Sequence, residues 1–138
     1  MISASVPITI QFYHLDPMEV VWHGNYARFF EQARCALLDV IGYNYPEMRE
    51  SGFAWPIVDM RIKFVRPARF GQHLIATATL VEYEMRIKID YLICDDASGE
   101  TLTKGQTIQV AVDGETGEMS YESPPILIEK VRRVQCAV

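Results

Sequence analysis

The sequence has few cysteines, no long apolar run and no cluster of basic residues. Its three cysteines are Cys35, Cys94 and Cys136. They lie far apart in the chain and form no Cys-x-x-Cys motif, so they predict free core thiols rather than disulfides or a structural zinc site. Free thiols are typical of a reducing compartment, and we therefore expect a cytoplasmic protein.

The absence of long apolar segments and of basic clusters argues against two kinds of partner, membranes and nucleic acids. No apolar stretch reaches the roughly 18–20 residues that a membrane-spanning helix needs, and the N-terminus lacks the basic and apolar regions of a secretory signal. The longest basic run is Arg132-Arg133, and the formal net charge is −5. We therefore expect neither membrane insertion nor nucleic-acid binding.

The composition is that of a folded chain with a core. Of the 138 residues, 49% are hydrophobic and 22% are charged. No linker, repeat or low-complexity segment interrupts the sequence. These features predict one domain that spans residues 1–138.

Hydrophobic periodicity predicts one long helix early in the chain. Residues 6–13 first alternate as a strand through Ile8, Ile10 and Phe12. Residues 25–41 then show the period of an amphipathic helix, and Gly42 is placed to end it. The apolar stripe of this helix comprises Tyr26, Phe29, Phe30, Ala33, Leu37, Val40 and Ile41.

The rest of the chain reads mainly as strands. After a short helical turn at residues 46–51, alternation predicts strands at 55–65, 72–83, 85–94 and 100–112, the last of them through Ile108, Val110 and Val112. Ser123-Pro124 can cap a terminal helix that runs through Arg133. Short connections force neighbouring strands to be antiparallel. One amphipathic helix and one antiparallel sheet predict an α+β fold in which the sheet covers the helix.

The residues with chemical potential gather in the loop before the long helix. His14, Asp16 and His23 lie in a segment that leads directly into the helix beginning at Asn25. The first N–H groups of a helix lack intrahelical partners and can hold the negative charge that develops on a carbonyl oxygen during acyl transfer. A carboxylate a few residues upstream can attack that carbonyl or activate water. A simple turn at Asp16 or a metal site of the three side chains are the alternatives.

The run from Asp16 to Arg34, DPMEVVWHGNYARFFEQAR, resembles the signature of hotdog-fold acyl thioesterases of the 4-hydroxybenzoyl-CoA thioesterase type, which include thioesterases associated with the Tol-Pal system. The resemblance extends to Phe64-x-x-Pro67-Ala68-x-x-Gly71 and to Gly105-x-Thr107. It implies a hotdog fold, a curved antiparallel β-sheet wrapped around one long central helix. It also implies hydrolysis of an acyl-CoA or acyl carrier protein thioester to free acid and thiol, with no cofactor or catalytic metal.

The resemblance assigns roles to five residues of the motif. Asp16 matches the catalytic carboxylate, which acts as nucleophile or general base. His23 is also expected at the catalytic centre, where its backbone N–H polarises the thioester carbonyl. Gly24, Asn25 and Tyr26 match the element that shapes the helix entry and binds the substrate.

One position departs from the family pattern. Glu19 stands where the family usually has glycine, so its side chain is expected to narrow the loop or to impose another backbone conformation. Glu31 matches the helix position of the acid in a related subfamily, although a solvated or subunit-interface role also fits it. Asp59 is expected to face solvent or a partner subunit. The cationic residues Arg61, Lys63, Arg66 and Arg69 fit either phosphate contacts or a solvated strand end.

The fold leaves other functions open, because hotdog proteins include hydratases and dehydratases. A non-catalytic acyl-CoA-binding module is a further alternative, and it would have no need for Asp16. The resemblance also implies a homodimer or homotetramer in which two sheets join into one and the active sites lie at the dimer interface. Such pairing would protect an edge strand that is otherwise unpaired.

Overall fold

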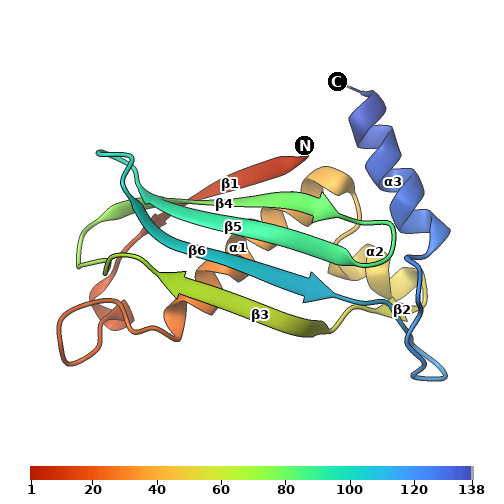
Figure 1. The fold of residues 1–138 in the computed structure, drawn as a ribbon, viewed down its shortest axis with the longest axis horizontal. Helices are drawn as coiled ribbons and strands as arrows, with labels where there is room; N and C mark the ends of the chain where they lie inside the picture. The colour runs from red at the N-terminus through yellow and green to blue at the C-terminus, as the bar shows by residue number, and fades with distance from the viewer. Residues whose placement is uncertain (138) are drawn as a thin grey trace.

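The computed structural model describes residues 1–137 and consists of one large sheet with helices on one side of it (Figure 1). The strands are β1 (Ser3–Thr9), β2 (Phe53–Ala54), β3 (Ile57–Phe64), β4 (His73–Glu82), β5 (Ile87–Asp95), β6 (Thr101–Gln109) and β7 (Val112–Asp113). The helices are α1 (Asn25–Ile41), α2 (Tyr45–Glu50) and α3 (Pro125–Cys136), and a 3-10 turn, η1, covers Phe12–His14.

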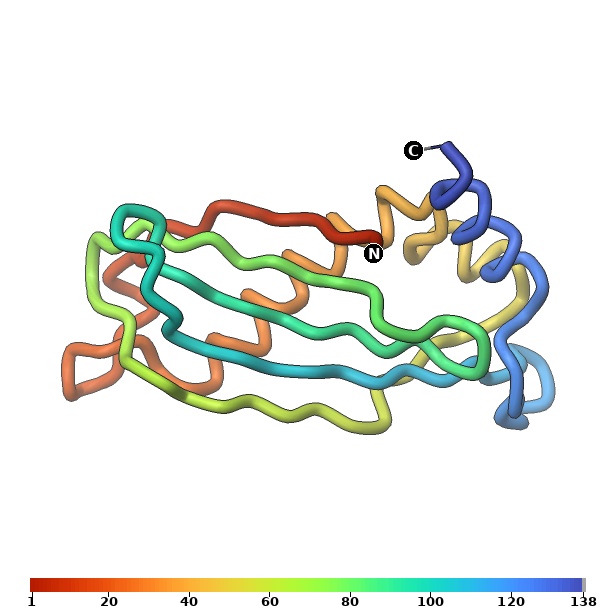
Figure 2. Tube along the Cα trace, turned by 45° about the horizontal axis from the view of Figure 1, so that its top comes forward, coloured from red at the N-terminus to blue at the C-terminus, as the bar shows by residue number. Residues whose placement is uncertain are grey.

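The large sheet has five strands in the order β1-β4-β5-β6-β3, and every neighbouring pair is antiparallel. Strands β2 and β7 form a separate two-stranded sheet. Helix α1 runs along one face of the large sheet and contacts β1, β4 and β5 (Figures 1 and 2). This is the predicted α+β arrangement, and the expected hotdog fold is confirmed.

Helix α1 begins and ends where the sequence predicts. Gly42 adopts a left-handed conformation with φ 79°, and its N–H donates to the carbonyls of Leu38 and Asp39. The prediction that Val40 belongs to the buried stripe is wrong, because its side chain is 48% exposed. Leu38, on another side of the helix, is buried instead. The other six residues of the predicted stripe are buried, so the helix turns the predicted face toward the sheet.

The first strand is displaced from its predicted position. β1 ends at Thr9, and Phe12 lies in η1 with 77% of its surface exposed, so the expectation that it continues the strand is wrong. The cause is local. The N–H of Gln11 donates to Nδ1 of His14 at 2.9 Å, and this hydrogen bond closes a turn where a strand would need both residues extended.

The buried face of β6 is not its most apolar one. Thr103, Thr107 and Gln109 are buried, whereas Ile108 is only half-buried on the opposite face. Tyr91 stacks on Phe30 of α1, with ring centroids 4.4 Å apart, and its hydroxyl hydrogen-bonds the Thr107 hydroxyl at 2.8 Å. Large aromatic rings from α1 and β5 thus fill the space above β6, which leaves room only for small or polar side chains there.

Two smaller expectations also need correction. Helix α3 starts at Pro125 after the extended residue Pro124, and no side chain caps it, so Ser123 does not act as the cap. The cysteines are free, as predicted, but they are not core residues: Cys35 and Cys136 are exposed and Cys94 is half-buried. None of the helices within residues 1–137 is long and apolar enough to cross a membrane.

Candidate active site

The loop that carries Asp16 is a closed turn held by its own backbone. The N–H of Asp16 donates to the carbonyl of Val20 at 2.8 Å, and the N–H of Glu19 donates to the carbonyl of Asp16 at 3.0 Å. The half-buried Asp16 carboxylate accepts the Met18 N–H through Oδ1 at 2.8 Å. This local hydrogen bond fixes one carboxylate oxygen, and Oδ2 has no hydrogen-bond partner among residues 1–137.

Glu19 occupies the left-handed region of the backbone, with φ 62°, and is the only described residue besides glycine to do so. Such a conformation is strained for a residue with a Cβ atom. The Glu19 side chain is exposed, so it does not narrow the loop. The chain thus keeps the backbone shape that favours glycine and tolerates the strain of a glutamate there.

The ends of the loop are anchored to the body of the protein. The N–H of Val21 donates to the carbonyl of Ala68, in the connection between β3 and β4, at 2.9 Å. The carbonyl of His14 accepts both the Trp22 N–H at 2.9 Å and the Asn25 side-chain amide at 2.8 Å. Because the Asn25 amide is buried and satisfied in this way, it orients the loop against the start of α1.

The start of α1 has no side-chain cap. Gly24 is the N-cap residue, and the backbone N–H groups of His23 and Gly24 have no hydrogen-bond partner within residues 1–137. The indole ring of Trp22 lies directly over Gly24, where any Cβ atom would overlap it. Glycine is therefore needed at this position, and two N–H donors remain available at the positive end of the helix.

A cavity of about 280 Å³ joins the loop, the helix start and the end of β3. Asp16, His23 and Tyr26 all line it, together with apolar residues that include Phe64 and Pro67. The structure therefore brings three of the five predicted residues to one cavity. Gly24 and Asn25 lie beside it without lining it.

Tyr26 is a buried part of this cavity wall. Its hydroxyl accepts the Ala68 N–H at 3.4 Å, and its ring packs edge to face on Phe64 with centroids 5.4 Å apart. Burial raises the pKa of the Tyr26 hydroxyl, and the hydrogen bond from Ala68 opposes that shift. The hydroxyl consequently stays protonated at neutral pH and serves as a neutral hydrogen-bonding group.

His14 is engaged in packing rather than turned toward the cavity. Besides accepting the Gln11 N–H, its ring packs edge to face on Phe29 at 5.2 Å between centroids. Burial and then the charge of Arg28 lower the pKa of the His14 imidazole, which favours the neutral ring. Within residues 1–137 no group of three or more His, Cys, Asp or Glu side chains is arranged to hold a metal ion.

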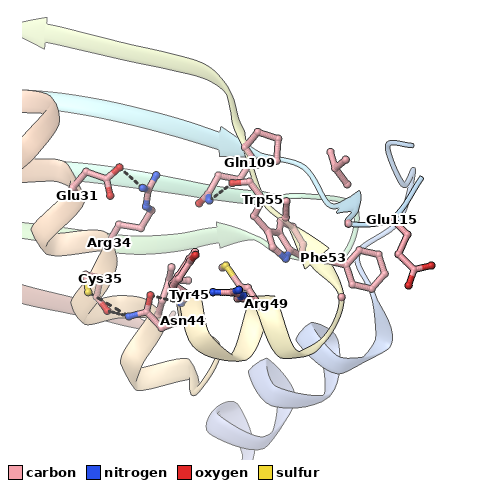
Figure 3. Close-up of a pocket in the computed structure, with 17 residues that line it drawn as sticks. Glu31, Arg34, Cys35, Asn44, Tyr45, Arg49, Phe53, Trp55, Gln109 and Glu115 are labelled. Carbon is pink, nitrogen blue, oxygen red and sulfur yellow. Dashed lines mark hydrogen bonds and ion pairs between the residues drawn. The ribbon is translucent and has the colours of Figure 1, made fainter. Parts of the chain in front are cut away.

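A second and larger cavity, of about 880 Å³, lies at the other end of the molecule between α1, α2 and the ends of β2 and β6 (Figure 3). Glu31 lines it and forms an ion pair with Arg34, which is only 12% exposed. Trp55 and Gln109 form part of its wall. Sequence reasoning did not identify this cavity, although a glutamine at an inward position of β6 could have indicated it.

The arrangement around Asp16 fits acyl transfer. The Asp16 carboxylate lines the same small cavity as His23. His23 directly precedes Gly24, the N-cap residue of α1, where no side chain caps the helix. Unpaired N–H donors there can stabilise an oxyanion, and the carboxylate can act as base or nucleophile.

Known proteins are similar to this chain in sequence and in fold. The model of the Thioesterase-like superfamily matches residues 10–133. A provisionally assigned acyl-CoA thioesterase of Bacillus subtilis, YneP, is 28% identical over 79% of this chain and 79% of its own length. A DHNA-CoA thioesterase of Staphylococcus aureus has a similar crystal structure, with TM-score 0.85 and 26% identity, covering 99% of this chain and 93% of that one. The protein described here belongs to the Thioesterase-like superfamily, whose hotdog fold it shares.

Proposed function

We propose that residues 1–138 form a single hotdog domain that hydrolyses an acyl-CoA thioester to free acid and coenzyme A. The observation that carries this proposal is the shared cavity of Asp16 and His23 beside an uncapped helix start. Membership of the superfamily supports the reaction class. An acyl carrier protein thioester presents the same reacting group and is the alternative substrate.

Asp16 is the proposed catalytic residue. The thioester carbonyl accepts hydrogen bonds from the N–H groups of His23 and Gly24, which take up the negative charge as the carbonyl becomes tetrahedral. By one route, the Asp16 carboxylate attacks this carbon and the thiolate leaves, and water then hydrolyses the resulting anhydride. By the other, Asp16 takes a proton from water, whose oxygen attacks the carbon, and the same thiolate leaves and is protonated.

We further propose that the protein acts as a homodimer, or as a homotetramer built from such dimers. Strand β3 is an edge of the sheet, and Val58, Met60 and Phe64 expose 57%, 39% and 53% of their surface along it. An unpaired edge with exposed apolar side chains favours pairing with a second copy. Across a two-fold axis the two β3 strands would run antiparallel.

This pairing has a consequence for the active site. The end of β3, at Phe64, contributes to the Asp16 cavity, whereas the residues just before β3, Trp55 and Pro56, line the larger cavity. Antiparallel pairing sets the end of one β3 beside the beginning of the other. Asp16 of one copy would then face the larger cavity of its partner. We assign this larger cavity to the acyl group of the substrate.

The cellular location is proposed on the cysteines. All three are free thiols, which fits a reducing compartment such as the cytoplasm.

Thiol release from a panel of acyl-CoAs tests the function. The panel spans short, medium and long chains and benzoyl groups, with an enzyme-only baseline for the protein's own thiols. We expect turnover on at least one member, and a loss of about 10²–10⁴-fold in kcat for Asp16→Asn with an unchanged melting temperature. Asp96→Asn, which changes an exposed carboxylate outside both cavities, is the matched control.

The outcomes separate the parts of the proposal. Turnover that survives in Asp16→Asn would contradict the role of Asp16. Dehydration of a 3-hydroxyacyl-CoA without thiol release would favour a dehydratase, and binding without any turnover would favour a ligand-binding module. A monomer in sedimentation of the active protein would contradict the shared active site.

A further inference from the structure

The larger cavity has mostly apolar walls with one unusual polar residue among them. Leu38 of α1, Met48 of α2, and Phe53 and Trp55 from the segment at β2 supply apolar surface, and Figure 3 labels the last two. Its volume of about 880 Å³ lies in the range of pockets that enclose small organic ligands. Gln109, at the end of β6, projects into this wall although only 4% of its surface is exposed.

The orientation of the Gln109 amide follows from its neighbour. Its nitrogen Nε2 donates to the backbone carbonyl of Trp55 at 2.8 Å. A carbonyl can only accept, so the nitrogen end of the amide must face Trp55 and Oε1 must point the other way. In the described part of the chain, this buried Oε1 has no hydrogen-bond partner.

Two other polar side chains of the cavity wall have partners within the chain. Arg34 forms its ion pair with Glu31, and the side-chain amide of Asn44 donates to Asp39 Oδ1 at 2.7 Å. Among the buried side-chain atoms of residues 1–137 that lack a partner, Gln109 Oε1 alone belongs to a residue that lines this cavity, so a ligand in the cavity is the natural source of its donor. A buried acceptor of this kind discriminates strongly, because a ligand without the matching donor leaves it unpaired.

We propose that Gln109 is a specificity residue which selects acyl groups with an apolar body and an O–H or N–H that donates to its Oε1. The inference rests on the proposed function, since it takes the larger cavity as the acyl site. The substrate class that fits is a hydroxylated or amino-substituted acyl thioester rather than a plain hydrocarbon chain. Acyl groups with an aromatic ring and acyl groups with an aliphatic chain can both carry such a donor, and the test below distinguishes the two.

The test compares kcat/KM for matched substrates. One arm uses benzoyl-CoA with its 2-, 3- and 4-hydroxy derivatives, and the other uses butyryl-CoA with 3-hydroxybutyryl-CoA. We expect the wild-type protein to favour a hydroxylated member over its parent by about tenfold or more. Gln109→Leu should lower kcat/KM for that member to the level of the parent and leave the parent nearly unchanged.

Two further variants separate recognition from stability. Gln106→Leu changes the same strand on its other face, where Gln106 bonds Asp90 at 2.8 Å, and should leave the substrate ratio unchanged. Gln109→Glu, as a protonated acid, can still donate to Trp55 and accept from the substrate, so it should keep the preference for the hydroxylated member.

Equal kcat/KM for parent and hydroxylated substrates in the wild-type protein would overturn this inference alone, whether or not Gln109→Leu folds. So would an equal loss on both substrates in Gln109→Leu. Thiol release from no member of either arm would overturn this inference, whereas only silence across the whole acyl-CoA panel would overturn the proposed function as well.

Discussion

The two ends of helix α1 differ in how their cavities are built. At its start, a closed turn and a network of short-range hydrogen bonds hold Asp16 beside a cavity of about 280 Å³. Toward its other end, side chains from distant segments enclose about 880 Å³. Figure 2 shows the loop and α2 at opposite ends of the sheet. Under the proposed function, chemistry and acyl recognition are separated within one chain, and the proposed two-fold pairing would bring them together.

Filling the larger cavity should have the largest effect of the changes that leave Asp16 in place. Cys35 is exposed on α1 and lines this cavity, so Cys35→Trp should block the acyl group. We expect kcat/KM to fall by about 10²-fold or more, since displaced substrates react poorly. Gln32→Trp, exposed on the same helix but outside the cavity wall, should retain activity. An active Cys35→Trp protein would argue that acyl groups bind elsewhere.

Crowding the helix start should have a moderate effect. In Gly24→Ala the new Cβ overlaps the Trp22 ring, which displaces the N–H groups of His23 and Gly24. Removing one oxyanion donor costs about 10²–10³-fold in kcat, and a displaced donor should cost about tenfold. The double variant Trp22→Ala/Gly24→Ala removes the overlap and should recover most of that loss in a steady-state thiol-release assay. Failure of the second substitution to restore kcat would mean that the alanine acts by another route.

Relieving strain in the Asp16 loop should have the smallest effect. Glu19→Gly removes the Cβ from a residue with φ 62°, whereas Glu19→Ala keeps it. The glycine variant should be more stable than the alanine variant by about 1 kcal/mol in denaturant unfolding. Equal stabilities would show that the loop relaxes when position 19 changes.

The Asp16 end could be predicted from sequence because its signals are local. The motif from Asp16 to Tyr26 occupies one loop and one helix start, so residues close in sequence meet at one cavity. Gly42 likewise marks the end of α1 where the structure has it. The sequence pattern does not reveal short-range hydrogen bonds. The one from the Gln11 N–H to His14 Nδ1 closes a turn, and β1 therefore ends earlier than predicted.

The larger cavity could not be predicted in the same way. Its walls come from α1, α2, the segment at Trp55 and the end of β6, which no local pattern connects. Alternation in the sequence predicts that β6 buries the face that carries Ile108. The rings of Phe30 and Tyr91 instead pack over the opposite face of β6. There a Cβ at Gly105 would overlap Phe30. Tertiary packing therefore decided which face of β6 is buried and placed Gln109 inside.

The central claim is that Asp16 of one copy works with the larger cavity of another. The most direct test mixes the Asp16→Asn and Cys35→Trp proteins, each inactive alone, under conditions that exchange subunits. Mixed dimers would hold one site with both an intact Asp16 and an open cavity. The account predicts recovery of about one quarter of wild-type thiol release, the share expected from random two-fold pairing. No recovery after verified subunit exchange would place both functions within a single chain and contradict the account.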